Sequence, residues 1–413
     1  MDTGTIFKGE FWRGRNVILG CLLGMMMSYN SIFFYSSGLF LKPLAAEFGW
    51  GRGAASLGIL VPLITAGILS PFTGRLIDRY GAFRMALLSA VGLSLSFLLL
   101  GIATVGLLSF LALTFLLALL SNATSPLSYG RFVLANFPRH LGLAYGIVYI
   151  GPGLGALVFP PLVTKLMSIY AWRGAYVGLA IVVLVSVPII ALLLKNQSAR
   201  NVTDAGTANR QWNWSLYTDR QFVLLAAIFL FASTGIFGTV VHLVPMLTDI
   251  GLSPAKAAEF AALMGFAVIA GRLITGFLLD RIEANLLAAT IFALSAGGIM
   301  LLATGNIAAI LPGILVVGFS IGSEIDLAFF IIGRRFPSIH FSTFFGGILF
   351  AVSIGGSLGP TVAGILYDAA GNYLPWFVIA TTSMVGSSIL CLVGRRSSLR
   401  YGVTDRVGQQ AMP

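Results

Sequence analysis

The sequence predicts an all-α membrane protein whose twelve transmembrane helices form two six-helix pseudo-repeats. Three observations support this prediction: the composition of the chain, the number of long apolar runs, and a motif that occurs once in each half. Of the 413 residues, 57% are hydrophobic and only 9% are charged. Because a soluble domain carries about 25% charged residues, we exclude a soluble globular protein and expect an integral membrane protein.

Apolar runs of about 20 residues are long enough to cross a bilayer as helices. Twelve such runs occur, six on each side of a polar stretch that is rich in Asn, Gln, Asp and Arg. The expected spans are 17–40, 54–74, 83–104, 106–130, 141–166, 174–194, 221–247, 255–279, 284–304, 308–333, 341–367 and 374–394. The expected domains are an N-terminal six-helix half at 1–194, a cytoplasmic linker at 195–220, a C-terminal six-helix half at 221–394 and a cytoplasmic tail at 395–413.

Positive charge lies mainly in the loops on one side of the predicted helices. Eighteen Lys and Arg residues fall on the side of the N-terminus, and five fall on the other side. Because cytoplasmic loops carry an excess of positive residues, both termini are expected in the cytoplasm of a multi-pass protein of the cell (inner) membrane. The same placement argues against nucleic acid as a partner, despite a net charge of +11, since basic nucleic-acid binders gather their Lys and Arg on one face.

A charged turn follows the second predicted helix and returns after the eighth. The first copy runs from Gly74 to Arg79 as Gly-Arg-Leu-Ile-Asp-Arg, and the second runs from Gly276 to Arg281 as Gly-Phe-Leu-Leu-Asp-Arg. Two parallel repeats of six helices are typical of a transporter whose halves rock about a binding site near the middle of the membrane.

The first copy continues as Gly-x-Leu-x-Asp-Arg-x-Gly-x-x-Arg, and this motif resembles the loop between helices two and three of the major facilitator superfamily. The resemblance implies that the charged turns act as gates, because an Asp and an Arg at a helix end can pair across helix termini and hold one side shut. The alternative is an ordinary charged cytoplasmic loop. The predicted gating residues are Gly74, Asp78, Arg79, Arg84, Asp280 and Arg281.

Further segments resemble the bacterial monocarboxylate-transporter branch of that superfamily, which is related to the oxalate/formate antiporters. They lie at 35–52, 172–173, 242–253, 322–327 and 359–368. The sequence departs from the pattern at Val268, where relatives often carry an acid or amide one turn before the arginine of helix eight. It also lacks a lysine between Phe344 and Pro360, which the oxalate-exchanging relatives carry in helix eleven. The missing lysine favours a monovalent carboxylate as substrate, because Arg272 alone would leave a divalent anion under-compensated.

Arg272 lies in the middle of an apolar run, eight residues before Asp280. At 1.5 Å per residue this places it about 12 Å into the membrane. A charged side chain at that depth is costly and marks a functional site by default. A guanidinium fits a carboxylate with two parallel hydrogen bonds, so we predict that Arg272 binds the substrate's carboxylate. The alternative is a structural ion pair with an acid on a neighbouring helix.

Glu324 and Asp326 are acids in the interior of a predicted span. Two residues apart on a helix, they point about 200° apart and face different neighbours. We predict that one of them takes up a proton when the Arg272 side chain turns toward the substrate. The other is expected to pair with a group on a neighbouring helix. A fixed buried pair is the alternative for each. Phe330, one turn after Asp326, is expected to line the same side.

Other polar groups lie at membrane depth and are candidates for the wall of a small polar cavity. His242 is a candidate proton relay, although a histidine at such a place is more often hydrogen-bonded between helices. The predicted substrate-binding residues beside Arg272 are Tyr29, Asn30, Asn122, Tyr149 and Phe330. Each of the polar ones could instead only hold helices together.

These features together predict a secondary active transporter that carries a small organic monocarboxylate, such as lactate or pyruvate, with a proton. The alternative is an organic anion exchanger, or an exporter of an aromatic acid or drug-like compound. An enzyme is not expected, because no nucleophile, metal cluster or cofactor motif is evident, and Cys21 and Cys391 lie in separate apolar runs. The expected partners are the substrate anion, the proton as coupling ion, and the lipid bilayer, with no other cofactor, and the protein is expected to function as a monomer.

Overall fold

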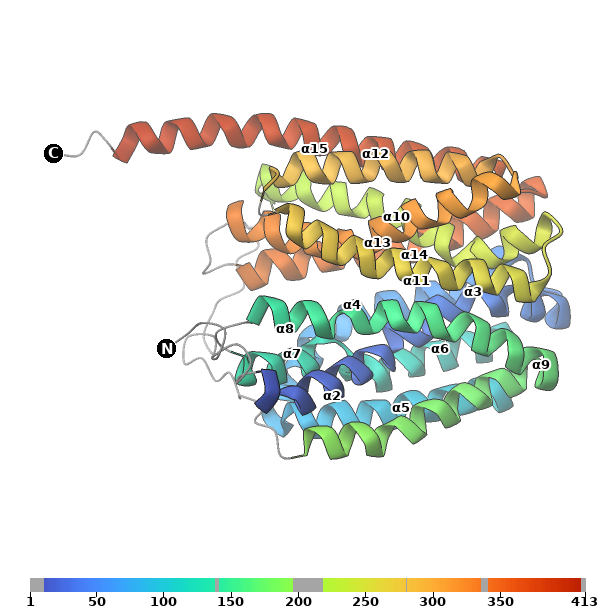
Figure 1. The fold of residues 1–413 in the computed structure, drawn as a ribbon. Coiled ribbons are helices and arrows are strands. Elements are labelled where there is room, and N and C mark those ends of the chain that lie inside the picture. The colour runs from blue at the N-terminus through green and yellow to red at the C-terminus, as the bar shows by residue number, and fades with distance from the viewer. Residues whose placement is uncertain (1–10, 138–140, 196–217, 280, 336–340, 410–413) are drawn as a thin grey trace.

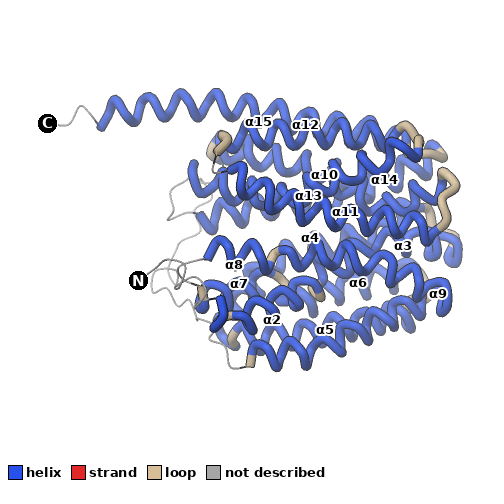
Figure 2. The backbone as a smooth tube through the Cα atoms, viewed as in Figure 1, coloured by secondary structure: helices blue, strands red, loops and turns tan. Residues whose placement is uncertain are grey.

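The computed structural model describes residues 11–137, 141–195, 218–279, 281–335 and 341–409. In this part of the chain the secondary structure is helical and contains no strand (Figure 2). The first group of helices is α2 (Arg15–Met26), α3 (Tyr29–Phe48), α4 (Arg52–Tyr80), α5 (Ala82–Ala103), α6 (Leu107–Ser121), α7 (Pro126–Asn136), α8 (Leu141–Val148) and α9 (Ile150–Leu194). The second is α10 (Arg220–Asp249), α11 (Pro254–Leu279), α12 (Ala284–Ala303), α13 (Ile307–Arg335), α14 (Phe341–Ala370) and α15 (Leu374–Gln409).

Eleven helical segments in the described ranges are long and apolar enough to cross a membrane. One of them, Leu143–Leu194, has 52 residues and contains two helices that meet at a kink at Ala171. The prediction of an all-α membrane protein is confirmed. The number of twelve crossings and the side of the membrane on which the termini lie stay predictions.

Three predicted spans are not continuous helices. The first is divided at Met27 and Ser28 into α2 and α3, the fourth is divided into α6 and α7 by a short 3-10 turn that begins at Asn122, and the fifth is divided at Tyr149 into α8 and α9. The breaks in the first and fourth spans face each other, because the backbone N–H of Tyr29 donates to Thr124 Oγ1 at 3.2 Å. A broken helix is tolerated at membrane depth where a neighbouring side chain satisfies the freed backbone group.

The helices form two bundles that lie side by side, blue to green and yellow to red in Figure 1. Contacts between the bundles join α3 to α10, α4 to α14, and α9 to α11. We call these bundles the N-terminal and C-terminal halves. The predicted linker at 195–220 lies mostly outside the described residues, so its boundaries stay a prediction.

The first and last described residues lie at the same end of the molecule, on the left of Figure 1. We call this the terminal end, and we call the opposite end, which holds the start of α4 and the kink of α9, the distal end. If the predicted orientation is right, the terminal end faces the cytoplasm and the distal end faces the outside.

Candidate substrate site between the two halves

The guanidinium of Arg272 lies inside the bundle with little access to solvent. Its side chain is 12% exposed, and its nearest ion-pair partner is Asp326, with 3.7 Å between Arg272 Nε and Asp326 Oδ2. That distance is too long for a hydrogen bond. Both Nε and Nη1 of Arg272 are buried and lack a hydrogen-bond partner. Because buried donors are normally satisfied, this arrangement leaves two N–H groups of a cation available to a ligand.

Small residues hold the helices of Arg272 and Asp326 together. A Cβ atom on Gly271 would lie 2.2 Å from the carbonyl oxygen of Phe319, and one on Gly322 would lie 2.0 Å from the carbonyl oxygen of Val268. Neither position can take a side chain unless α11 and α13 move apart. One turn further along α11, Thr275 Oγ1 and Ser323 Oγ are hydrogen-bonded at 2.7 Å. The backbone contact therefore fixes how closely the guanidinium approaches the carboxylate.

The N-terminal half contributes aromatic side chains to the same site. The centre of the Tyr149 ring, at the junction of α8 and α9, lies 4.9 Å from the Arg272 guanidinium carbon. Tyr35 of α3 lies within electrostatic range of Arg272. A cation over a tyrosine face is attracted by the ring electrons. The site is therefore shared by both halves, as a transporter whose halves rock about its substrate requires.

Asp326 and Glu324 point to different neighbours, in keeping with their spacing on α13. The Asp326 side chain is 29% exposed beside Arg272. Glu324 is only 1% exposed, and its carboxylate accepts a short hydrogen bond from the hydroxyl of Ser233 on α10. Asp326 therefore belongs to the Arg272 site, whereas Glu324 joins two helices within the C-terminal half. Phe330, one turn beyond Asp326, is half-buried against the hydrophobic core.

The other predicted polar residues are not gathered around Arg272 by any contact that we observe. Asn122 is buried, and its Nδ2 donates to Thr73 Oγ1 at 2.9 Å. Tyr29 is buried with its ring stacked on Phe33, and its hydroxyl is one of the buried groups without a hydrogen-bond partner. Asn30 is exposed. These three line the paired helix breaks of the N-terminal half.

His242 lies at the distal end and takes part in a hydrogen-bond network there. It is fully buried. Its Nδ1 lies 2.8 Å from Tyr373 Oη, and its Nε2 lies 2.9 Å from the carbonyl oxygen of Pro360 and 3.1 Å from Ser56 Oγ. These contacts connect α4 in one half to α10 and α14 in the other.

The predicted gating residues lie at the terminal end, where their described contacts stay local. Arg281, in the turn after α11, stacks on Phe277 of that helix and donates to the carbonyl oxygen of Phe277 at 3.0 Å. Arg79 stacks on Tyr80, Arg84 is exposed, and a Cβ atom on Gly74 would meet no atom within 4 Å. Asp280 and the side chain of Asp78 fall outside the described residues. Within the described ranges, no ion pair joins the halves at this end.

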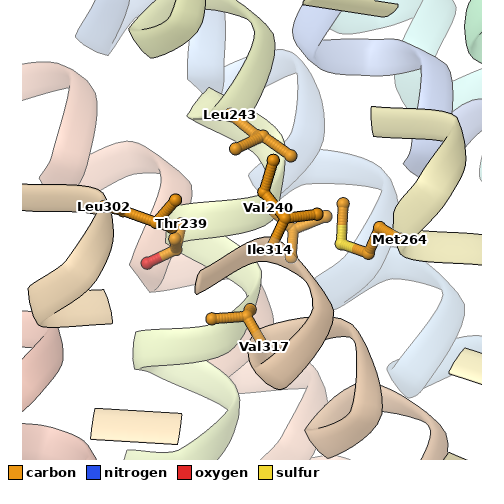
Figure 3. Close-up of a pocket in the computed structure, with 7 residues that line it drawn as sticks. All are labelled: Thr239, Val240, Leu243, Met264, Leu302, Ile314 and Val317. Carbon is orange, nitrogen blue, oxygen red and sulfur yellow. The ribbon is translucent and has the colours of Figure 1, made fainter. Parts of the chain in front are cut away.

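A small apolar pocket lies inside the C-terminal half, separate from the Arg272 site (Figure 3). It has no room for a water molecule, so we read it as a packing gap between α10, α11, α12 and α13. Its lining residues are Thr239, Val240, Leu243, Met264, Leu302, Ile314 and Val317.

Residues 21–360 match the family model of the Major Facilitator Superfamily. The chain is 28% identical over 379 residues to monocarboxylate transporter 13 of Bos taurus, which covers 89% of this chain and 85% of that protein. It is 25% identical over 420 residues to monocarboxylate transporter 12 of Homo sapiens, covering 91% and 79% of the two chains. It is also 26% identical over 374 residues to a 38 kDa protein of a 23S RNA operon of Thermoproteus tenax, covering 89% and 92%.

Among solved structures, the fold is similar to a bacterial homologue of the human lysosomal transporter Spinster in an inward-facing and occupied conformation. The TM-score is 0.63 at 14% sequence identity, and the match covers 93% of this chain and 94% of that one. At this identity the likeness bears on the fold alone.

Proposed function

The chain belongs to the major facilitator superfamily, and from this premise we propose that it carries a small organic monocarboxylate across the membrane together with a proton. It is a multi-pass membrane protein related to monocarboxylate transporters. We also propose that it lies in the cell (inner) membrane and works as a monomer. The Arg272 site supports the proposed substrate class and the proposed coupling to protons.

The single observation that carries the proposal is the state of the Arg272 guanidinium. It is a buried cation at the junction of the halves, with two N–H groups that no protein group accepts. A planar carboxylate can accept two parallel hydrogen bonds from one edge of the guanidinium, either from Nε with Nη2 or from Nη1 with Nη2. A compact monovalent anion also suits a site with one arginine and one nearby acid, because a dianion would leave charge uncompensated.

Proton coupling follows from the neighbouring carboxylate. Asp326 lies 3.7 Å from Arg272, so a substrate carboxylate that binds the guanidinium takes over the role of Asp326 as counter-charge. The displaced Asp326 is then a largely buried anion without a partner, which is costly. Uptake of a proton removes this cost, so substrate and proton bind together. Glu324 already has Ser233 as its partner, and we assign the proton to Asp326.

Alternating access follows from the site's position. Arg272 and Asp326 come from the C-terminal half, and Tyr149 and Tyr35 come from the N-terminal half. A rocking movement of the halves changes which side of the membrane reaches the site while the ion pair, formed within one half, stays together. The domain boundaries at 1–194 and 221–394 give the two rocking bodies.

Uptake into proteoliposomes tests this proposal. An inward proton gradient should drive accumulation of radiolabelled lactate by the wild-type protein. The Arg272→Ala protein should remain monodisperse in detergent yet take up no label above empty liposomes. Arg220→Ala, which removes an exposed arginine at the start of α10, is the matched control and should transport normally. Full uptake by Arg272→Ala would exclude this arginine as the substrate anchor.

Counterflow separates symport from the alternative of anion exchange. Proteoliposomes loaded with unlabelled acid and held without a proton gradient show tracer exchange in either case. Only a symporter also shows net uptake that follows an imposed proton gradient. Gradient-independent exchange with no net uptake would favour the exchanger.

A further inference from the structure

Among the described residues, ion pairs join the two halves at one end of the molecule only. In the described ranges, the ion pairs between the halves are Lys42 with Asp249 at 2.5 Å and Arg52 with Asp249 at 2.6 Å. Lys42 and Arg52 belong to the N-terminal half, and Asp249 ends α10 in the C-terminal half. The start of α4, which begins at Arg52, is at the distal end, and the two ion pairs bring Lys42 of α3 and Asp249 to the same place.

Arg52 is the centre of this connection. Its Nη1 and Nη2 donate to the two carboxylate oxygens of Asp249 at 2.6 and 3.0 Å. Its Nη1 also donates to Tyr373 Oη at 2.7 Å, and its guanidinium carbon lies 3.6 Å from the centre of the Tyr367 ring. The Arg52 side chain is only 12% exposed. The guanidinium thus binds Asp249 through two hydrogen bonds, stacks on Tyr367 and is largely shielded from solvent, which makes the contact strong and directional.

The backbone around Arg52 is held by the opposite half as well. The N–H groups of Arg52 and Gly53 donate to the carboxylate of Asp368 on α14 at 2.7 and 2.8 Å. Asp368 thus satisfies two free N–H groups at the first turn of α4, where a negative charge is also favoured by the helix dipole. A helix of one half is therefore capped by a side chain of the other.

Glycine is required at three positions for this approach. A Cβ atom on Gly51 would lie 2.3 Å from Asp368 Oδ2, and one on Gly53 would lie 2.8 Å from Ile365 Cγ1. On the facing helix, a Cβ atom on Gly364 would lie 2.7 Å from the carbonyl carbon of Arg52. The Gly-Arg-Gly turn is therefore shaped to dock against α14.

His242 supports the same contact from inside the bundle. Tyr373 Oη accepts from Arg52 and can donate to His242 Nδ1, while His242 Nε2 can donate to the carbonyl oxygen of Pro360. This assignment places the ring proton on Nε2 and gives every group a partner. His242 is thus a positioning residue for Tyr373, which in turn orients Arg52.

We propose that Arg52, with its glycine-flanked turn, and the carboxylates of Asp249 and Asp368 form an ionic gate that closes the distal end. The gate must open for the substrate site to reach the distal side. This inference rests on the proposed transport by rocking halves but not on the identity of the substrate. Two carboxylates and two cations face one another across the gate, so the closed state leaves no net charge at the seam.

The distance between spin labels across the distal end tests the gate. Labels at Ala46→Cys on the N-terminal half and Ala255→Cys on the C-terminal half occupy exposed positions, in a background where both native cysteines are replaced by alanine. The wild-type gate should give mainly the short distance. Arg52→Gln and Asp368→Asn should each raise the ratio of long to short distances about tenfold, because a coupling of this kind typically changes an equilibrium 5- to 150-fold.

Arg173→Gln is the matched control. Arg173 forms an ion pair of 2.8 Å with Glu47 near the same end, but both residues belong to the N-terminal half. Its loss should leave the distance distribution unchanged, even if the melting temperature falls. The gate is refuted if neither Arg52→Gln nor Asp368→Asn shifts the distribution, or if Arg173→Gln shifts it equally.

The two readouts separate the gate from the proposed function. A protein whose distances respond as expected but that takes up no monocarboxylate would contradict the proposed substrate and support the gate. If uptake depends on Arg272 but the spin-label distances do not respond to the variants, the proposed function would be supported and the gate refuted. Monodisperse elution of each variant in detergent confirms that the measured protein is folded.

Discussion

Replacing Asp326 by Asn removes the carboxylate that lies 3.7 Å from Arg272 and keeps the size of the side chain. At this separation, the attraction between two unit charges is about 4.5 kcal/mol at an effective dielectric constant of about 20. The dehydration of both groups offsets part of this, and a net coupling of about 1–3 kcal/mol corresponds to roughly 5- to 150-fold in affinity. Asp326→Asn should therefore bind lactate more tightly than the wild type at high pH by a factor in this range.

The pH dependence has a definite sign. In the wild type, substrate binding requires a proton on Asp326, so binding is strongest at low pH and weakens as the pH rises. With one proton per anion, the dissociation constant should rise by up to about tenfold per pH unit above the pH at which Asp326 releases its proton in the absence of substrate, until the roughly 5- to 150-fold loss of affinity is reached. In Asp326→Asn this group no longer titrates, and the dissociation constant should stay level while lactate itself remains ionised.

Titration calorimetry of lactate into detergent-solubilised protein, repeated from about pH 5.5 to about pH 8.5, measures this slope. Glu324→Gln is the matched control, because Glu324 faces Ser233 and not Arg272; it should keep the slope of the wild type. A wild-type slope in Asp326→Asn, or a level curve in Glu324→Gln, would refute the assignment of the proton to Asp326.

Three further variants test the construction of the site. Tyr149→Phe should retain lactate affinity, whereas Tyr149→Leu should weaken it roughly two- to thirtyfold in calorimetry, because only the aromatic face stabilises the cation, by about 0.5–2 kcal/mol. Gly322→Ala should lower the thermal unfolding temperature in detergent, since its Cβ would lie 2.0 Å from the carbonyl oxygen of Val268 and such overpacking costs about 1–3 kcal/mol; unchanged unfolding would contradict the close contact. Ser233→Ala should also destabilise the protein, by about 1–3 kcal/mol, because it leaves the buried Glu324 without its hydrogen-bond donor; a stability equal to wild type would mean that Glu324 has another partner.

Much of the fold follows from composition and from the length of apolar runs. In lipid, the backbone N–H and C=O groups must be satisfied within the segment, which favours helices, so each predicted span has a helical counterpart in the structure. The cost of burying charge in lipid makes Arg272 conspicuous in its apolar run. The spacing of Glu324 and Asp326 predicted that they face different neighbours, because two residues on a helix are separated by about 200°.

The breaks and the distal contacts could not be predicted from the sequence. At the break between α2 and α3, the backbone N–H of Tyr29 donates to Thr124, a residue far away in the chain. The periodicity of the sequence carries no information about such a partner. Tyr35 was visible only as part of a family-like segment, and nothing local indicated that it lies near Arg272. The sequence makes His242 a candidate proton relay, and only the structure shows its contacts with Tyr373 and with the carbonyl oxygen of Pro360.

The central claim is that Arg272 recognises the carboxylate of the substrate. The most direct test compares the binding of lactate and its uncharged amide, lactamide, to the wild type and to Arg272→Gln by calorimetry at low pH. We expect the wild type to prefer lactate strongly and Arg272→Gln to bind the two ligands about equally, because the remaining contacts do not depend on the negative charge. A variant that still prefers lactate as strongly as the wild type would exclude Arg272 as the group that recognises the carboxylate.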